Sequence, residues 1–350
     1  MYKHILIVKP SSLGDIIHTL PLLNSLKADL PDSLIDWVVA GEFKDLLTGH
    51  PMINRLFIIN KGQWKNLKKL PQTFKELLSL SKDLRKQHYD LCIDVQGLFR
   101  SGLITALSGA SVRLGFSDAR EGAPVFYNLK IKGGKGIHAV DRYLKLLSPL
   151  KIGHADIEFP LPHIKTRRIV HNSYYILVPG ARWETKLWPP EYFAELINLL
   201  ANKAPFNRYV PVIVGTKADK SRAAQIKSLS RVDVMDLTGK TNLTELVSYI
   251  KGATFVVTND SGPMHIAAAV NTQVFAIFGP TSARLTGPYG EGHVVVTASV
   301  DCRPCFKKNC NDLRCMIRLK PDHVYESILK NCWCNLVEPD KNQDLGYNSI

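Results

Sequence analysis

The sequence FVVTNDSGPMHIAAA, residues 255–269, has the pattern of a strand, a tight turn and a helix. Its apolar start predicts a buried strand over 255–257, and 258–263 predict a polar turn. Pro263 suits the first turn of a helix, because proline lacks the N–H group that would be unpaired there. Gly262 has no side chain to keep a ligand away from the backbone. The stretch therefore predicts a βα unit.

The start of this predicted helix offers an anion site. Asp260 or Ser261 can cap the helix. The remaining N–H groups of a helix N-terminus attract negative charge, so a phosphate or diphosphate is the expected ligand. A well-capped turn without any ligand explains the same residues, and both interpretations stay open at this point.

Strands and helices alternate on both sides of this turn. Short, largely apolar runs predict strands buried on both faces of a parallel sheet; they cover 5–8, 35–39, 56–59, 89–95, 174–178, 210–214, 234–237 and 274–278. Intervening segments predict helices over 16–28, 43–47, 74–84, 139–147, 191–200 and 243–251. This alternation is typical of a doubly wound α/β fold with right-handed crossovers.

The alternation is interrupted once. Residues 97–136 are rich in Gly, Arg and Lys and show no clear period, and 149–166 carry three prolines and predict a linker. We therefore expect two domains, 1–165 and 166–335, and a polar tail, 336–350. Ligands of such folds bind beyond the carboxyl ends of the strands, so loop residues carry the function.

The composition is that of a globular protein with an acidic partner. The 350 residues include 45 Lys and Arg against 31 Asp and Glu, a net charge of +14. That excess suits a nucleic acid, an anionic membrane surface or a phosphorylated substrate, although no nucleic-acid motif appears. The apolar N-terminal run is too short for a signal peptide, and no run is long enough for a membrane span, so we expect a cytoplasmic protein.

Two candidate residues follow the first predicted strand. Asp15 lies in a loop at the start of a helix, where it can cap the helix or act as a general base. His18 lies one helical turn further on and shares that face; a surface or core histidine is the alternative.

Two further candidates lie in the second half. Lys186 follows a strand in a long loop, where it is either one surface lysine among many or the positive charge that stabilises a diphosphate leaving group. His265 lies in the first turn of the helix after Pro263, where contacts that cap the helix are the alternative to a ligand contact.

Four of the seven cysteines lie close together, at Cys302, Cys305, Cys310 and Cys315. Four thiolates can hold a structural Zn²⁺, but this spacing is tighter than that of common zinc ribbons. Free thiols and a redox-dependent disulfide are the alternatives. A catalytic metal is not expected there, because four thiolates leave no open coordination position.

Three sequence blocks together resemble one family. They are KPSSLGDIIHTLP at 9–21, KLWPP at 186–190, and TNDSGPMH at 258–265 with FGPT at 278–281. In this order and spacing they resemble the lipopolysaccharide heptosyltransferases, the ADP-heptose-using members of glycosyltransferase family 9. The resemblance extends to about residue 329.

The resemblance implies a GT-B fold, two Rossmann-like domains facing across a cleft, and metal-independent transfer with inversion. It implies that Asp15 is the general base and that Lys186 contacts the donor phosphates. The implied donor site is Asp260, Ser261, Gly262, Pro263, Met264, His265, Lys240 and Thr241, with Asp219 as a candidate for the ribose contact. No cofactor is required, and ADP-heptose is the donor substrate.

The resemblance also implies an anionic acceptor, a 3-deoxy-octulosonate–lipid A core or its first heptose. Its expected contacts are Gly14, His18, Lys61, Lys65, Arg120 and Arg142. An anionic acceptor would account for the excess of positive charge in the sequence. The enzyme is then expected at the cytoplasmic face of the inner membrane as a peripheral protein, with no nucleic acid as partner.

Two other functions remain alternatives. A nucleotide-sugar epimerase shares the fold but needs no acceptor site, so the basic residues would have no role. A basic protein that binds nucleic acid or membrane without catalysis would show steeply salt-dependent binding and no affinity for an ADP-sugar.

Overall fold

The computed structural model describes residues 2–60, 70–153, 156–166, 169–170 and 172–332. The first half contains β1 (His4–Val8), α1 (Leu13–Ile17), α2 (Leu20–Asp29), β2 (Leu34–Ala40), β3 (Arg55–Ile59), α3 (Leu70–Arg85), β4 (Leu91–Asp94), α4 (Phe99–Leu107), β5 (Val112–Phe116), β6 (Leu129–Ile131) and α5 (Ala139–Leu144). The second half contains β7 (Tyr174–Val178), α6 (Pro190–Ala201), β8 (Val210–Ile213), α7 (Lys220–Leu229), β9 (Met235–Asp236), α8 (Leu243–Gly252), β10 (Phe255–Asn259), α9 (Gly262–Ala269), β11 (Gln273–Ile277), α10 (Ala283–Thr286), β12 (Val294–Val296), α11 (Arg314–Ile317) and α12 (Pro321–Asn331).

Both halves repeat one strand order. The first sheet runs β3-β2-β1-β4-β5-β6, and the second, taken in the same sense, runs β9-β8-β7-β10-β11-β12. All neighbouring strands are parallel. This is the doubly wound Rossmann order, in which the direction of winding reverses between the first and fourth strands. The predicted fold class, two Rossmann-like sheets of the GT-B type, is confirmed.

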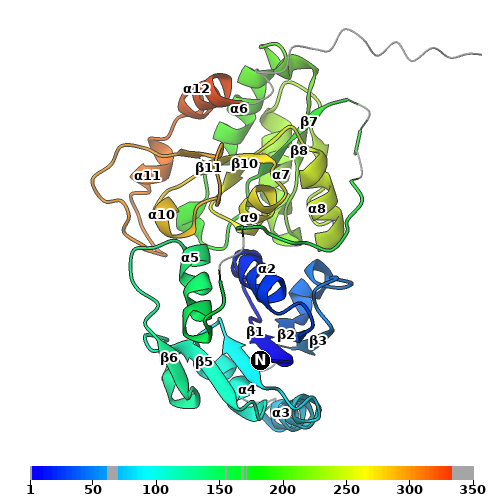
Figure 1. Ribbon diagram of the computed structural model, residues 1–350. Coiled ribbons are helices and arrows are strands. Elements are labelled where there is room, and N and C mark those ends of the chain that lie inside the picture. The colour runs from blue at the N-terminus through cyan, green and yellow to red at the C-terminus, as the bar shows by residue number, and fades with distance from the viewer. Residues whose placement is uncertain (1, 61–69, 154–155, 167–168, 171, 333–350) are drawn as a thin grey trace, which may run out of the picture.

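The functional loops leave the sheets where the winding reverses. The loop before α1 follows β1, and the turn before α9 follows β10, which pairs with β7 and β11. At this point the two flanking crossovers lie on opposite faces of the sheet, so the loops leave room for a ligand. In Figure 1 the two sheets lie one above the other, with α2 and α5 of the first half facing the end of the second half that carries α9.

Apolar packing joins the two halves. One buried cluster contains Ile5 and Ile7 of β1 as well as Val256 of β10 and Met264 of α9. Separate clusters cover the outer face of each sheet. The halves therefore share part of one core, and none of the helices in the described ranges is long and apolar enough to cross a membrane.

Residues 97–136, which show no clear period in the sequence, contain α4, β5 and β6, and none of these elements was predicted. Their apolar signal is weak, since β5 carries Arg113 and Gly115 and the edge strand β6 carries Lys130. Gly115 is needed because a Cβ there would lie 2.4 Å from the ring of Tyr127.

Two predicted boundaries were also wrong. The single helix over 16–28 is two helices, α1 and α2, because Pro21 cannot donate the backbone hydrogen bond that would continue the first. The predicted turn at 258–263 begins later, since Thr258 and Asn259 still pair within β10. Helices α7, α10, α11 and α12 and strand β12 were not predicted. The boundary between residues 165 and 166 stays a prediction.

Candidate active site

Both carboxylate oxygens of Asp15 accept hydrogen bonds. The backbone N–H and the hydroxyl of Ser12 donate to Oδ2 at 2.9 and 2.7 Å, and the Tyr143 hydroxyl donates to Oδ1 at 2.9 Å. The Ser12 bonds close a capping box at the start of α1, so the predicted helix cap is confirmed. The Asp15 side chain is still 35% exposed. Capping therefore leaves the carboxylate accessible to a substrate hydroxyl.

Lys9 lies beneath this carboxylate. Its side chain is 2% exposed, its Nζ lies 3.8 Å from Oδ1 of Asp15, and it donates to the Tyr143 hydroxyl at 3.1 Å. Burial alone would raise the pKa of Asp15, but the Lys9 charge and the Ser12 hydrogen bonds outweigh it and lower the pKa below its ordinary value. Asp15 is consequently ionised at neutral pH and can accept a proton.

Sequence reasoning missed Lys9 and Tyr143. A lysine that directly follows an apolar strand buried on both faces was the available signal for Lys9. Tyr143 lies on α5, and nothing local in its sequence marks it as a neighbour of Asp15.

We predict that Lys9→Met moves the acid limb of the pH–rate profile to higher pH. Without the ammonium group, the largest influence that opposes the burial of Asp15 is gone, so the pKa of Asp15 rises. The variant then loses its carboxylate, and its activity, at a higher pH on acidification. The measurement is kcat/KM against pH, with the exposed Lys3→Met as control; superimposable profiles for Lys9→Met and the wild type would contradict the prediction.

Lys186 forms a buried ion pair with Asp260. Its Nζ lies 2.6 Å from Oδ2 of Asp260, and the two side chains are 15% and 6% exposed. The hydroxyl of Thr281 donates to the same oxygen at 2.6 Å. Nζ of Lys186 also lies 4.6 Å from the centroid of the Trp183 ring, a cation–π contact. A cation is thus fixed at the amino end of α9.

Asn259 fixes the loop that carries Lys186. Its side-chain amide donates to the carbonyl of Pro179 at 2.8 Å and accepts from the N–H of Trp188 at 3.2 Å. Both ends of the loop are thereby tied to the last residue of β10. Sequence reasoning quoted Asn259 only as part of the family motif and did not assign it this role.

The predicted donor turn starts α9. Ser261 occupies the N-cap position, although its hydroxyl lies 3.2 Å from that of Thr258 rather than on a helix N–H. Pro263 lies in the first turn, as predicted. Met264 is fully buried in the shared core, so its side chain packs against the protein.

The first turn of α1 packs directly against that of α9. A Cβ at Gly14 would lie 2.3 Å from Cδ2 of His265, and a Cβ at Gly262 would lie 2.6 Å from Cδ2 of Leu13. His18 Nε2 lies 2.9 Å from His265 Nδ1. This contact brings the first turn of α1, which contains Asp15, to the turn of the second half that contains Asp260, the ion-pair partner of Lys186.

A second contact between the halves lies nearby, on α5. His138 Nε2 lies 3.1 Å from the carbonyl oxygen of Gly287, and the Tyr289 hydroxyl donates to Asp141 at 2.7 Å.

We predict that Gly14→Ala lowers kcat/KM by about 100-fold. A methyl group cannot fit against the buried His265 ring, so the contact between the halves must open or His265 must move. Steady-state kinetics measure the loss. The matched control is Gly41→Ala, whose Cβ would lie at an ordinary 3.5 Å from Ile58; equal activity of the two variants would contradict the steric argument.

The remaining predicted donor residues lie at the carboxyl ends of β8 and β9. Asp219 accepts hydrogen bonds from the backbone N–H and the hydroxyl of Thr216 at 2.8 and 2.7 Å. Lys240 donates to the carbonyl of Asp236 at 2.7 Å, and Thr241 is half-buried. These positions agree with a site at the carboxyl edge, and their contacts with a ligand stay predictions.

The predicted acceptor residues divide into three sets. Gly14 and His18 pack against His265 of the second half, and His18 is buried, so these two form part of the contact between the halves. Burial lowers the pKa of Lys9, and the negative charges of Asp15 and Asp94 oppose this change. The positive charges of Arg142 and Arg120 lower the pKa of Lys9 further. Both guanidinium groups therefore lie within electrostatic reach of this site. Arg142 also stacks 4.0 Å from the centroid of the Phe116 ring. Lys61 and Lys65 lie outside the described residues.

The four clustered cysteines are free thiols with different surroundings. Cys315 is buried, Cys305 is half-buried, and Cys302 and Cys310 are exposed. Within the described part of the chain, no three His, Cys, Asp or Glu side chains are grouped as a metal ion would require. The loop nevertheless adjoins the predicted donor site, since the N–H groups of Cys305 and Phe306 donate to the carbonyl of Pro280 at 3.0 and 2.9 Å.

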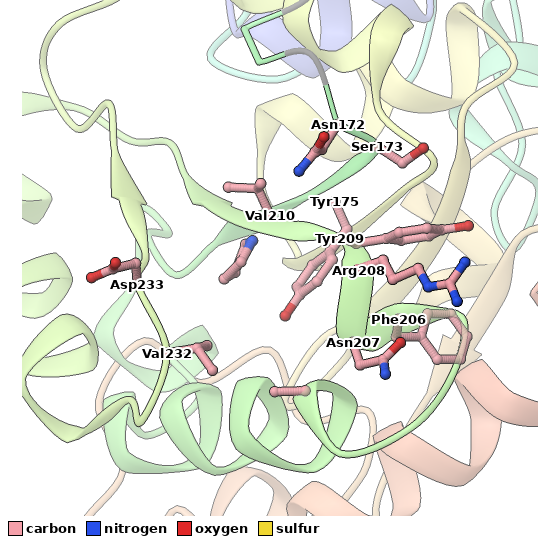
Figure 2. A pocket seen from close by; sticks show the side chains of 12 residues that line it. Asn172, Ser173, Tyr175, Phe206, Asn207, Arg208, Tyr209, Val210, Val232 and Asp233 are labelled. Carbon is pink, nitrogen blue, oxygen red and sulfur yellow. The ribbon is translucent and has the colours of Figure 1, made fainter.

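A hollow of about 650 Å3 lies at the opposite edge of the second sheet. Its lining includes Tyr175 near the start of β7 and Val210 at the start of β8, and Figure 2 shows the Tyr175 ring pointing into it. Because ligands of doubly wound sheets bind beyond the carboxyl ends, this hollow at the amino ends is separate from the candidate site.

Comparison with known proteins agrees with this geometry. Residues 77–315 match the glycosyltransferase family 9 (heptosyltransferase) model. Lipopolysaccharide heptosyltransferase 1 of Pseudomonas aeruginosa is 30% identical over 91% of this chain and 95% of its own. The structure of the E. coli heptosyltransferase WaaC with ADP superimposes with a TM-score of 0.78 at 27% identity, covering 94% of this chain and 99% of that one. E. coli heptosyltransferase II, at 22% identity and a TM-score of 0.74, shares the fold. The chain belongs to glycosyltransferase family 9, and it is a heptosyltransferase.

Proposed function

We propose that this enzyme transfers heptose from ADP-L-glycero-D-manno-heptose to the inner core of lipopolysaccharide, with inversion at the anomeric carbon. The observation that supports the proposal is the packing of α1, which contains Asp15, on α9, whose amino end adjoins the ion pair of Asp260 with Lys186. The names of the relatives support it, since one is a lipopolysaccharide heptosyltransferase and a solved structure holds ADP.

In the proposed reaction, Asp15 takes the proton from the acceptor hydroxyl as that oxygen attacks the anomeric carbon. The bond from that carbon to the diphosphate breaks on the opposite face, through an oxocarbenium-like transition state. Lys186 and the N-terminus of α9 stabilise the charge that develops on the departing ADP, in the role that a metal ion has in other transferases.

The acceptor is proposed to lie on the first half, near Arg120 and Arg142. Its phosphates and carboxylates suit their positive charge, and Lys61 and Lys65 are proposed to bind the same acceptor. We place the enzyme at the cytoplasmic face of the inner membrane, in peripheral contact, because the acceptor is a lipid.

The test offers ADP-heptose with two defined acceptors, one ending in 3-deoxy-octulosonate and one carrying a first heptose. We expect one of them to gain a single heptose, with ADP released in equal amount. The accepted substrate identifies the heptose position. Interconversion of the ADP-sugar without an acceptor would instead establish an epimerase, and release of neither product would overturn both assignments.

Structural zinc at Cys302, Cys305, Cys310 and Cys315 is not favoured. Elemental analysis of protein purified without chelators tests this, and a stoichiometric metal that is lost when a cysteine is replaced would contradict it.

A further inference from the structure

The contact between His18 and His265 joins two buried imidazoles. Their side chains are 3% and 7% exposed, and His18 Nε2 lies 2.9 Å from His265 Nδ1. Burial lowers the pKa of His18 well below its ordinary value, and it lowers the pKa of His265 to about 4. Both rings are neutral at neutral pH, so one of them donates and the other accepts.

The second nitrogen of His18 decides which ring donates. His18 Nδ1 is buried and has no hydrogen-bond partner among the described residues. If His265 donated, His18 Nδ1 would carry a buried N–H without an acceptor, which is the rarer kind of unsatisfied group in proteins. If His18 donates, Nδ1 is a bare nitrogen, and the proton of His265 lies on Nε2.

The neighbouring His138 cannot change this assignment. Its Nδ1 accepts from the N–H of Val140 at 3.2 Å, so the proton lies on Nε2, which donates to the carbonyl of Gly287 at 3.1 Å. Both of its nitrogens are occupied, and its ring meets the His18 ring edge-on, with centroids 5.1 Å apart.

The nitrogen of His265 that remains lies at the junction of the two halves. The Cδ2–Nε2 edge of the ring is closest to Gly14, next to Asp15, and Nε2 makes no hydrogen bond with any residue in the described ranges. The charges of Asp260 and Asp15 both act on this ring. A proton on Nε2 is therefore available to a ligand that binds between the base and the ion pair.

We propose that His18 is a positioning residue that holds His265 in its Nε2–H tautomer, so that His265 donates a hydrogen bond to an oxygen of the sugar nucleotide. The inference rests on the proposed function for the identity of that ligand. A neutral donor strengthens its hydrogen bond as negative charge develops on the acceptor oxygen and adds no charge to the site. A phosphoryl oxygen and a sugar hydroxyl both have the required chemistry.

The tautomer can be measured on the protein alone. In protein labelled with 15N-histidine, long-range 1H–15N correlations distinguish the two neutral tautomers, and His265→Gln identifies the signal among the 11 histidines. We expect the Nε2–H form in the wild type and in His18→Gln, whose side-chain amide can still donate. We expect a mixture in His18→Phe. An Nδ1–H form in the wild type, or an unchanged signal in His18→Phe, overturns the proposal.

Kinetics test the consequence for the donor substrate. His18→Phe should raise KM for the ADP-sugar, or lower kcat, by about ten-fold or more, whereas His18→Gln should stay within about three-fold of the wild type. The exposed His323→Gln is the matched control. Equal losses in His18→Phe and His18→Gln would show that the histidine has only a packing role, and thermal melting of both variants checks that they fold.

Binding of ADP identifies the accepting oxygen. If His18→Phe weakens ADP and the ADP-sugar equally, the acceptor is a phosphoryl oxygen; if only the ADP-sugar is affected, it is a sugar hydroxyl. Unchanged affinity for both ligands, together with unchanged turnover of the ADP-sugar, overturns the proposed hydrogen bond from His265. Because the tautomer measurement needs no substrate, it retains its meaning even if the wild type fails to transfer heptose.

Discussion

Replacement of Asp15 by asparagine is expected to lower the rate of heptose transfer by about 10³-fold, within the range that a general base contributes. Asparagine keeps the size of the side chain, and its single carbonyl oxygen can still accept from Ser12, so the helix cap largely survives, whereas its amide nitrogen cannot accept from Tyr143. What it loses is the ability to take the proton from the acceptor hydroxyl.

Affinity for ADP separates this role from a structural one. Asp15 lies on α1 of the first half, whereas the proposed diphosphate contacts lie on the second, so ADP should bind Asp15→Asn nearly as tightly as the wild type. Single-turnover transfer and calorimetric titration with ADP give the two quantities. The exposed Asp32→Asn is the control, and turnover by Asp15→Asn above about a tenth of the wild-type rate would remove Asp15 as the base.

Replacement of Lys186 by methionine is expected to weaken ADP-heptose binding and to slow transfer by about 10² to 10³-fold in total. The loss has two separate causes. The diphosphate loses a cation, and Asp260 is left as a buried charge that accepts, among the described side chains, a hydrogen bond only from the Thr281 hydroxyl. Breaking a buried ion pair by removing one partner costs about 3 kcal/mol of folding stability or more.

A double variant distinguishes the two causes. Lys186→Met combined with Asp260→Asn removes the uncompensated charge, so it should recover most of the lost melting temperature while transfer remains low. Lys203→Met, an exposed lysine after α6, serves as control for the loss of one positive charge. Recovery of transfer together with stability would mean that Lys186 acts only through folding.

The predictable part of the fold was its interior. Strands β1, β7 and β10 are continuous apolar runs because both of their faces are buried, and that pattern is visible without any tertiary information. Strands β5 and β6 approach the edge of their sheet, where Arg113 and Lys130 are tolerated, and the same criterion fails there.

The site divides in the same way. Lys186 and Asp260 lie in polar loops after strands and Asp15 lies in the first turn of the helix after β1, where a doubly wound fold binds its ligands, and the family resemblance assigned their roles. Lys9 directly follows β1 and is buried, and the Tyr143 hydroxyl donates to Asp15 from α5. Such contacts arise only when elements distant in the chain pack together, so no local pattern predicts them.

The separation of the two sheets has a consequence for how this enzyme is made. All the strand pairs in the described chain lie within one half, so each sheet can complete its backbone ladder without the other. Domains generally fold as units during synthesis, the N-terminal one first. The Asp15 half can therefore become ordered while the ribosome is still translating the second sheet. His265 and Asp260 leave the ribosome much later, so transfer activity is acquired only after the strands of the second sheet have been synthesised.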